Sequence, residues 1–284
     1  MQRAAVTQPL WPESPGQRLV LDRARAYGVL SSIRKDNIYW FGARGFLFTS
    51  PWVVTSNTVR HSAVLLLTTS GEPIQLTLDG RVVRHDALAV APLTRRGLRA
   101  VDVGLVSVHI EVHHPCFRAF RNIAGAGVLG LDRKAFAPFD ATLVGAYEGW
   151  LAKGEAEQLF EGLVKTAEGQ LPGPRRRDPR AELLHELLRE NPACSLGDLA
   201  RELRLSYTGA SHLFSRAVGL PLRSYQHSVK RLRAAERLHE DVSLTEIAHQ
   251  AGFTDSAHLC RAHQRHYGLP PSYIRDAQHV RLFL

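Results

Sequence analysis

Residues 243–260 are SLTEIAHQAGFTDSAHLC, and residues 195–214 are SLGDLARELRLSYTGASHLF, a looser version of the same segment. In both, a serine precedes apolar residues that recur at three- and four-residue steps, and an acidic residue (Asp198 or Glu246) follows that serine by three positions. A serine and a carboxylate at this spacing satisfy the free amides at the start of an amphipathic helix. The repetition predicts two copies of one small helical unit.

Each copy continues into a second predicted helix after a short break. The break falls at Arg204-Leu205 in the first copy and at Gly252-Phe253 in the second, and Ser206 or Asp255 then caps the next helix. A short helix, a tight turn and a second helix with a polar outer face form a helix-turn-helix. For one such unit alone, an ordinary helical pair is the favoured interpretation. Two copies at one period favour the helix-turn-helix.

A connecting helix of about 17 residues is predicted between the two units, within Leu222 to Glu240. At 1.5 Å per residue it would span ~25 Å, so that the two outer helices would lie about one DNA turn, ~34 Å, apart on one side of a duplex. Small polar residues and arginines on those helices suit base edges and phosphates. The net charge of +9 agrees with this only weakly, because both parts of the chain share the excess.

The first half of the chain has the pattern of short strands. The stretch from Ile74 to Val83 alternates apolar and polar residues around Asp79-Gly80, a dipeptide typical of tight hairpins. Such runs predict an antiparallel barrel or sandwich over about residues 37–138. At about residues 139–168 the period changes to that of two helices, broken near Lys153-Gly154. Their apolar stripe would be buried on this barrel or against a second subunit.

The segment LPGPRRRDPR at residues 171–180 predicts an exposed linker, because proline ends helices and removes backbone donors. We therefore expect an α+β protein of two domains. Residues 1–170 would form the strand-rich domain with its helical pair, and residues 181–284 an all-α domain.

Residues 180–275 resemble the AraC/XylS family of bacterial transcriptional regulators. The resemblance depends on SLTEIAHQAGFTDSAHL, on GLPPSYIR at the end of the second unit, and on Arg231-Leu232 with Ala235 and Leu238 in the connecting helix. In the last helix this chain has Leu259 and His263 where the family usually has phenylalanine. The resemblance and the outer faces of the helices together imply DNA contacts by Thr208, Ser211, His212, Ser256, Ala257, Arg261 and Arg265.

The resemblance also implies the other functional features of the chain. The family's companion domain is often a cupin-like barrel with two helices, used for effector sensing and dimerisation. The expected partners are thus double-stranded operator DNA, a small-molecule effector, a second subunit bound through helices 139–168, and RNA polymerase if the protein activates transcription. No secretory signal and no apolar run of ~20 residues is present. We expect a cytoplasmic, nucleoid-associated protein that contacts no membrane.

Two further interpretations concern the strand-rich domain. The aromatic-rich start of the barrel offers effector-binding candidates, Trp40, Phe46, Trp52 and His61, although aromatic residues that simply fill the barrel are the favoured interpretation. A cupin-type metalloenzyme with a DNA-binding tail is the alternative function, with His109, Glu111 and His113 as ligands on one strand face. Ligands ~6.5–7 Å apart along one strand converge poorly on an ion, so a solvated strand face is expected, with no metal, no cofactor and no catalytic residue.

The three cysteines, Cys116, Cys194 and Cys260, are an odd number with no short pairwise spacing. Free thiols in a reducing compartment are therefore expected. Cys260 lies on the last predicted helix, where a redox-sensing thiol is the alternative to a spare surface cysteine.

Overall fold

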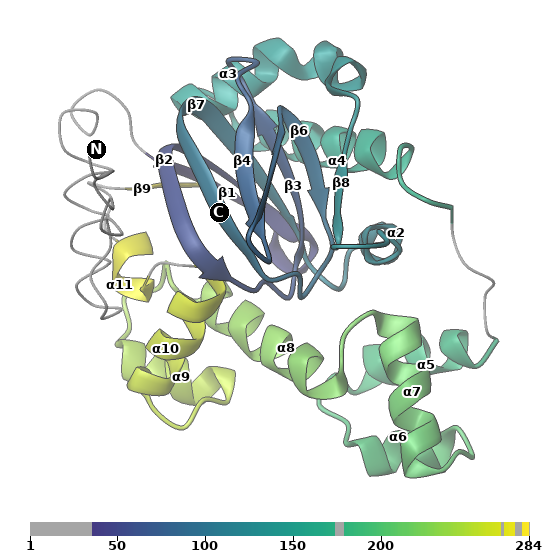
Figure 1. The fold of residues 1–284 in the computed structure, drawn as a ribbon. Helices are drawn as coiled ribbons and strands as arrows, with labels where there is room; N and C mark the ends of the chain where they lie inside the picture. Colours follow the sequence, from purple (N-terminus) through teal and green to yellow (C-terminus); the bar gives the residue numbers. More distant parts are fainter. Residues whose placement is uncertain (1–35, 174–178, 268–269, 276–279, 284) are drawn as a thin grey trace, which may run out of the picture.

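The computed structural model describes residues 36–173, 179–267, 270–275 and 280–283 (Figure 1). The N-terminal segment assessed for a secretory signal lies outside these residues, as do residues 174–178 of the expected linker and the start of the second Gly-Leu-Pro at Gly268. Among the described helices, none has the length and apolarity needed to span a membrane.

The strand-rich region forms one sheet that is antiparallel except at one edge. Its order is β8-β6-β3-β7-β2-β1-β9, with β4 beside β7 and β5 beside β4. The long strands β2 and β7 pair along most of their length, with register shifts near Ser50 and Thr55. The strands are β1 (Asp36–Trp40), β2 (Gly45–Thr58), β3 (Ala63–Thr68), β4 (Ile74–Leu78), β5 (Arg81–His85), β6 (Ala87–Val90), β7 (Arg96–Ile110), β8 (Val128–Gly130) and β9 (Val280–Phe283).

The predicted hairpin is confirmed. Strands β4 and β5 pair from Ile74 opposite His85 to Leu78 opposite Arg81. The turn residues Asp79 and Gly80 both have positive φ, 45° and 81°. This conformation matches the twist of the flanking strands and favours the Asp-Gly dipeptide.

The predicted helical pair is also confirmed, and it covers one face of the sheet (Figure 1). After α2 (Phe117–Arg121) and the 3-10 helix η3 (Arg133–Phe139) come α3 (Asp140–Glu148) and α4 (Lys153–Glu168). The break lies earlier than predicted, at the left-handed Gly149, and Gly154 is in the first turn of α4. The apolar stripe of α4 is buried in the same core as Tyr39, Leu47 and Val108, so it packs on its own sheet.

The C-terminal helices form two small cores at opposite ends of one connecting helix. The first core joins α5, α6, α7 and the start of α8, and the second joins the end of α8 to α9 and α10. Helix α8 has 15 residues, or ~22 Å, slightly shorter than predicted. The helices are α5 (Pro179–Glu190), α6 (Leu196–Glu202), α7 (Tyr207–Val218), α8 (Leu222–Glu236), α9 (Leu244–Ala251), α10 (Ser256–Tyr267) and α11 (Pro271–Ile274).

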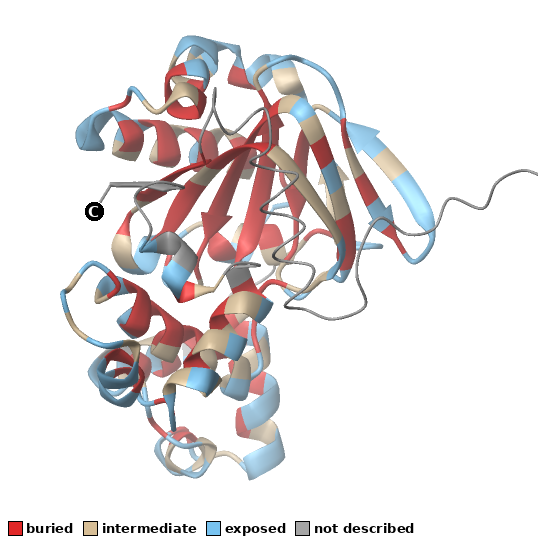
Figure 2. Cartoon of the chain, turned by 90° about the vertical axis from the view of Figure 1, so that its left-hand side faces the viewer, coloured by how far each residue is buried: buried red, intermediate tan, exposed pale blue. Residues whose placement is uncertain are grey.

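The helical part of the chain packs directly against the sheet domain. Leu220 lies in the core of the sheet domain, and strand β9 adds in parallel to β1 at the edge of the sheet. In Figure 1, α8 runs below the sheet, with α6 and α7 near one end and α9 and α10 near the other. Figure 2 shows buried residues both in the sheet and on the helix faces that pack inward.

Candidate DNA interface

The first helical unit begins with the predicted cap. The Ser195 hydroxyl accepts a hydrogen bond of 3.1 Å from the amide of Asp198, whose carboxylate accepts one from the Ser195 amide. The turn between α6 and α7 passes through Arg204, which has a positive φ of 50°. Ser206 then caps α7 by accepting from the Gly209 amide at 3.1 Å. These local bonds fix where each helix begins and how the chain turns between them.

The second unit repeats this construction with different residues. Ser243 accepts from the Glu246 amide at 3.1 Å, and Gly252 makes the left-handed turn. The Asp255 carboxylate accepts from the His258 amide at 2.6 Å at the start of α10. The Lys230 ammonium of α8 donates to the Gly252 carbonyl oxygen at 2.7 Å, so the turn is anchored to the connecting helix.

Helices α7 and α10 have the same length, and each buries one face in its own core. Both have 12 residues, and their first residues, Tyr207 and Ser256, are 49 positions apart. The inward positions of α7 (Ala210, Leu213, Phe214 and Ala217) are buried. In α10, Leu259 and His263 are buried and Ala262 is half-buried. Each helix therefore turns one face to its core and the other to solvent.

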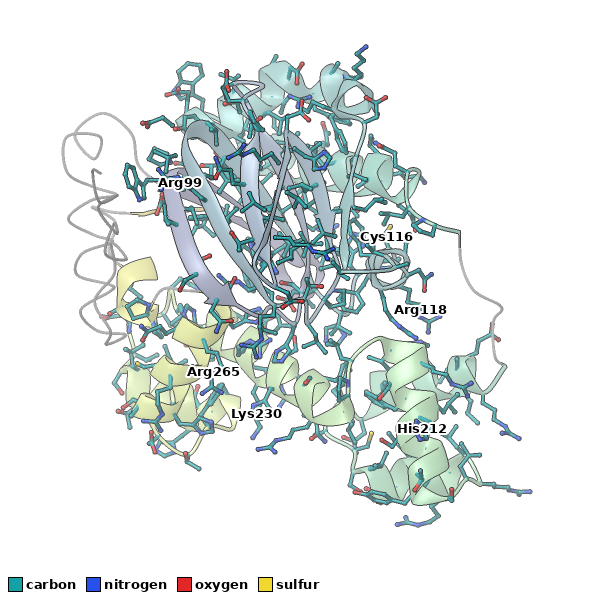
Figure 3. The ribbon with its side chains drawn as sticks, viewed as in Figure 1. Arg99, Cys116, Arg118, His212, Lys230 and Arg265 are labelled. Atoms are coloured by element: carbon teal, nitrogen blue, oxygen red, sulfur yellow. The ribbon has the colours of Figure 1, made fainter. Side chains whose placement is uncertain are left out.

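The residues predicted to contact DNA lie on the outward faces. Ser256 is half-buried at the first turn of α10, and the other six are exposed: Thr208, Ser211, His212, Ala257, Arg261 and Arg265. Figure 3 shows His212 on α7 and Arg265 on α10, with Lys230 on α8 between them. Tyr207, with 66% of its surface exposed at the start of α7, belongs to the same surface, as its position directly after the cap already indicated.

The four effector candidates lie in three separate places. Trp40 and Phe46 stack with ring centroids 5.7 Å apart, and Phe46 stacks on His109 at 4.2 Å. Trp52 lies further along β2, past the register shift at Ser50. His61 stacks instead on His266 of α10, with centroids 5.6 Å apart. The structure brings Trp40 and Phe46 together and places His61 at the boundary with the helical domain.

The expectation of a solvated strand face at the end of β7 is wrong. His109 and Glu111 are only 6% and 1% exposed, and the expectation holds for His113 alone, which is exposed. Glu111 contacts Ser228 of α8 and His266 of α10, both far away in sequence, whereas His109 stacks on Phe46 of the neighbouring strand β2. Two serine hydroxyls hold the His109 ring, from Ser62 at 3.2 Å and Ser107 at 3.1 Å. Within the described ranges, no three His, Cys, Asp or Glu side chains come together as ligands of a metal ion.

Glu111 joins the two parts of the chain, a role that sequence reasoning missed. The Ser228 hydroxyl of α8 donates to its carboxylate at 3.0 Å, and the His266 Nε2 lies 3.5 Å from the other oxygen. Burial raises the pKa of Glu111, while Arg231 and the Ser228 hydrogen bond oppose this rise. One signal was available: His266 occupies the position in α10 that Ala217 occupies in α7.

Further contacts tie the first unit to the sheet domain. The Arg121 guanidinium of α2 donates to the Arg216 carbonyl oxygen of α7, and the His113 ring packs edge-on against Tyr225 of α8 at 5.4 Å. Both units are thus held by the sheet domain while their outward faces stay open to solvent.

The cysteines are free among the described residues. Burial raises the pKa of the half-buried Cys260, and Arg261 opposes this rise only in part. A raised pKa keeps the thiol protonated and slow to react, which favours the spare-cysteine interpretation.

Residues 199–277 match a protein family described as "Helix-turn-helix domain". The chain is also similar to solved structures. The match with ToxT from Vibrio cholerae O395 covers 85% of this chain and 96% of ToxT, with 15% identity and a TM-score of 0.48. For the C-terminal domain of the response regulator yesN from Fusobacterium nucleatum, the shares are 35% and 100%, with 24% identity and a TM-score of 0.31.

The AraC-like transcriptional activator CuxR is 14% identical over 62% of this chain and 72% of its own, with a TM-score of 0.35. No curated protein matches the sequence significantly.

The capped helix pairs and the family match define this part of the chain as a helix-turn-helix domain, a module that binds double-stranded DNA. This domain carries two such units on one connecting helix, α8.

Proposed function

We propose that this protein regulates transcription by reading two successive major grooves from one side of a duplex, α7 in one groove and α10 in the next. The observation that carries the proposal is the pair of equivalent 12-residue helices, capped alike and exposed on their outer faces. A connecting helix of 15 residues spans ~22 Å. The width of the two units extends this toward the ~34 Å between successive grooves on one face of DNA.

The base-reading residues of this proposal are Thr208, Ser211 and His212 in the first unit, and Ser256, Ala257, Arg261 and Arg265 in the second. Their type suits the role. An arginine donates two parallel hydrogen bonds to a guanine edge, and small residues allow the helix backbone to come close to the bases. The exposure of Arg261 and Arg265 supports their availability, since neither guanidinium is buried within the domain.

Residues 1–170 would act as the sensor, with residues 171–180 as a linker to the DNA-binding domain at 181–284. A small-molecule effector would bind near the stacked Trp40 and Phe46 and shift the population of DNA-competent arrangements. Any homodimer through residues 139–168 would use the outer helix surface, where Val144 and Trp150 are 41% and 74% exposed. The inner stripe of α4 is already buried.

The proposal describes a cytoplasmic regulator, which contacts RNA polymerase if it activates transcription, and it includes no enzymatic step. The hydrogen bonds that hold His109 and Glu111 support this. They engage these side chains within the protein, with Ser62, Ser107 and Ser228, instead of leaving them directed at a substrate.

Selection of bound sequences from random duplex DNA with the full chain tests the proposal, followed by footprinting of the selected site. We expect two protected tracts about one helical turn apart on one face. Protection of a single groove, or no enrichment of any sequence, would contradict it.

A further inference from the structure

Two histidines stack on each other at the contact between the sheet and the second helical unit. His61, in the loop between β2 and β3, and His266, in α10, have ring centroids 5.6 Å apart and planes inclined by 26°. His266 is 3% exposed. The two rings come from positions more than two hundred residues apart, so their contact exists only while α10 is docked on the sheet.

The surroundings of this pair are mostly basic. Arg60 and Arg231 are both buried, and their charges act on His266, while Arg231 and His227 act on His61. Glu111 is the acidic group against His266, at 3.5 Å. The titratable and charged groups that face the pair come from three directions: Arg60 beside His61, His109 and Glu111 from the β7 end, and His227 and Arg231 from α8.

The helix-turn-helix fold itself does not require a histidine at this place. The corresponding residue of α7 is Ala217, and the residue corresponding to His263 is Phe214. The first unit thus forms its core with an apolar residue at the position where the second has His266. A buried histidine at that position is explained by what it contacts on the sheet.

We propose that the His61–His266 pair makes the docking of the second helix-turn-helix unit on the sheet sensitive to acid. A proton on either ring places a positive charge beside the partner ring and the buried Arg60 and Arg231, where little water can screen it. The repulsion between this charge and its neighbours is removed when α10 leaves the sheet. The release of α10 from the sheet in acid involves this chain alone. Only the effect of that release on DNA binding rests on the proposed function.

The direction of the effect follows from proton linkage. Burial and the nearby cations lower the pKa of His61 to about 4 and hold that of His266 well below 6.5. Because the docked state requires neutral rings, docking is complete above pH 6.5 and weakens as the pH falls below it. For His61 alone, docking at pH 5.5 weakens about 10-fold. Glu111 opposes this weakening of docking, because its raised pKa favours the docked state in acid. Its effect is that of one group, whereas both His61 and His266 act in the other direction.

Hydrogen–deuterium exchange of the full chain at pH 7.5 and pH 5.5, with labelling times matched for intrinsic rates, tests the proposal. We expect peptides covering α10 and the end of β7 to lose protection at pH 5.5, while peptides covering β3 keep theirs. In His61→Phe, which keeps a stacking ring but cannot titrate, the acid-induced loss should be about 10-fold smaller. His266→Gln should reduce the loss in the same direction.

His249→Gln is the matched control, because His249 lies on α9 of the same unit and is exposed; this variant should respond to acid as the wild type does. Circular dichroism at both pH values checks that each variant is folded. Equal protection of α10 at the two pH values would overturn the proposal. So would a loss that extends to β3, or one that is unchanged in His61→Phe and His266→Gln.

Discussion

The Ser228 hydroxyl of α8 donates a 3.0 Å hydrogen bond to the Glu111 carboxylate at the end of β7, across 117 positions of sequence. Both residues are buried. A carboxylate in such a place depends on its few donors, because water cannot replace them. The bond therefore joins the stability of the sheet domain to the position of the connecting helix between the two helix-turn-helix units.

Removal of that donor should destabilise the protein. Ser228→Ala is expected to lower the free energy of unfolding by ~1–3 kcal/mol, the cost of a buried acceptor left without its partner. Urea unfolding followed by circular dichroism measures this. Ser224→Ala, one turn away on the same helix and half-buried, should change stability by less than ~0.5 kcal/mol. Equal losses of stability in the two variants would contradict the prediction that the Ser228–Glu111 hydrogen bond stabilises the protein.

Arg261→Ala should weaken binding to the selected site by ~1–3 kcal/mol and relax preference at one base pair, as expected for a guanidinium that contacts a base edge. Binding assays on the selected duplex and its single-base variants measure both effects. Arg99→Ala, an exposed arginine of the sheet shown in Figure 3, is the control and should bind as the wild type does. Uniform weakening across all sequences would assign Arg261 to a phosphate instead.

Two glycines should respond in opposite directions to alanine. Gly252 has a φ of 85°, so Gly252→Ala is expected to cost ~1–2 kcal/mol of stability through the left-handed backbone alone. Gly154 lies in the first turn of α4 with nothing near its added Cβ. Gly154→Ala should stabilise by ~0.4–1 kcal/mol, because alanine restricts the unfolded chain. Thermal unfolding of both variants checks the pair, and effects of the same sign would contradict the backbone argument.

Asp36 should make the protein less stable as pH rises. Burial raises the pKa of this carboxyl to about 7, and a hydrogen bond with Ser50 opposes the rise. The folded state keeps a proton that the unfolded state loses above pH 3.8, so this contribution is present in acid and is lost as the pH rises toward 7. The loss amounts to at most about 4 kcal/mol.

Asp36→Asn should therefore be more stable than the wild type at pH 8 and should lack this dependence. Urea unfolding between pH 4 and pH 8 measures it. Asp102→Asn is the control, because Asp102 is exposed and asparagine tolerates its positive φ. An unchanged pH dependence in Asp36→Asn would show that the carboxyl is ionised in the folded state.

The local features of the fold could be predicted from the sequence. Helix starts at Ser195, Ser206 and Ser243, and the hairpin at Asp79-Gly80, all occur where their residues predicted them. Each depends on groups within about four positions of one another, and such bonds form in nearly the same way whatever surrounds them. The repeat of those signals was enough to predict two helix-turn-helix units.

The placement of burial could not be predicted in the same way. His109 and Glu111 alternate with apolar residues as a solvated strand face would, yet both are buried, Glu111 against Ser228 of α8 and His266 of α10. The stacking of His61 on His266 likewise has no signal in the local sequence. The sequence by itself determined which helices and turns form, because those are decided by neighbours along the chain. Only the tertiary structure decided which polar faces are covered, because the exposure of a side chain to solvent depends on segments that can lie more than a hundred residues away.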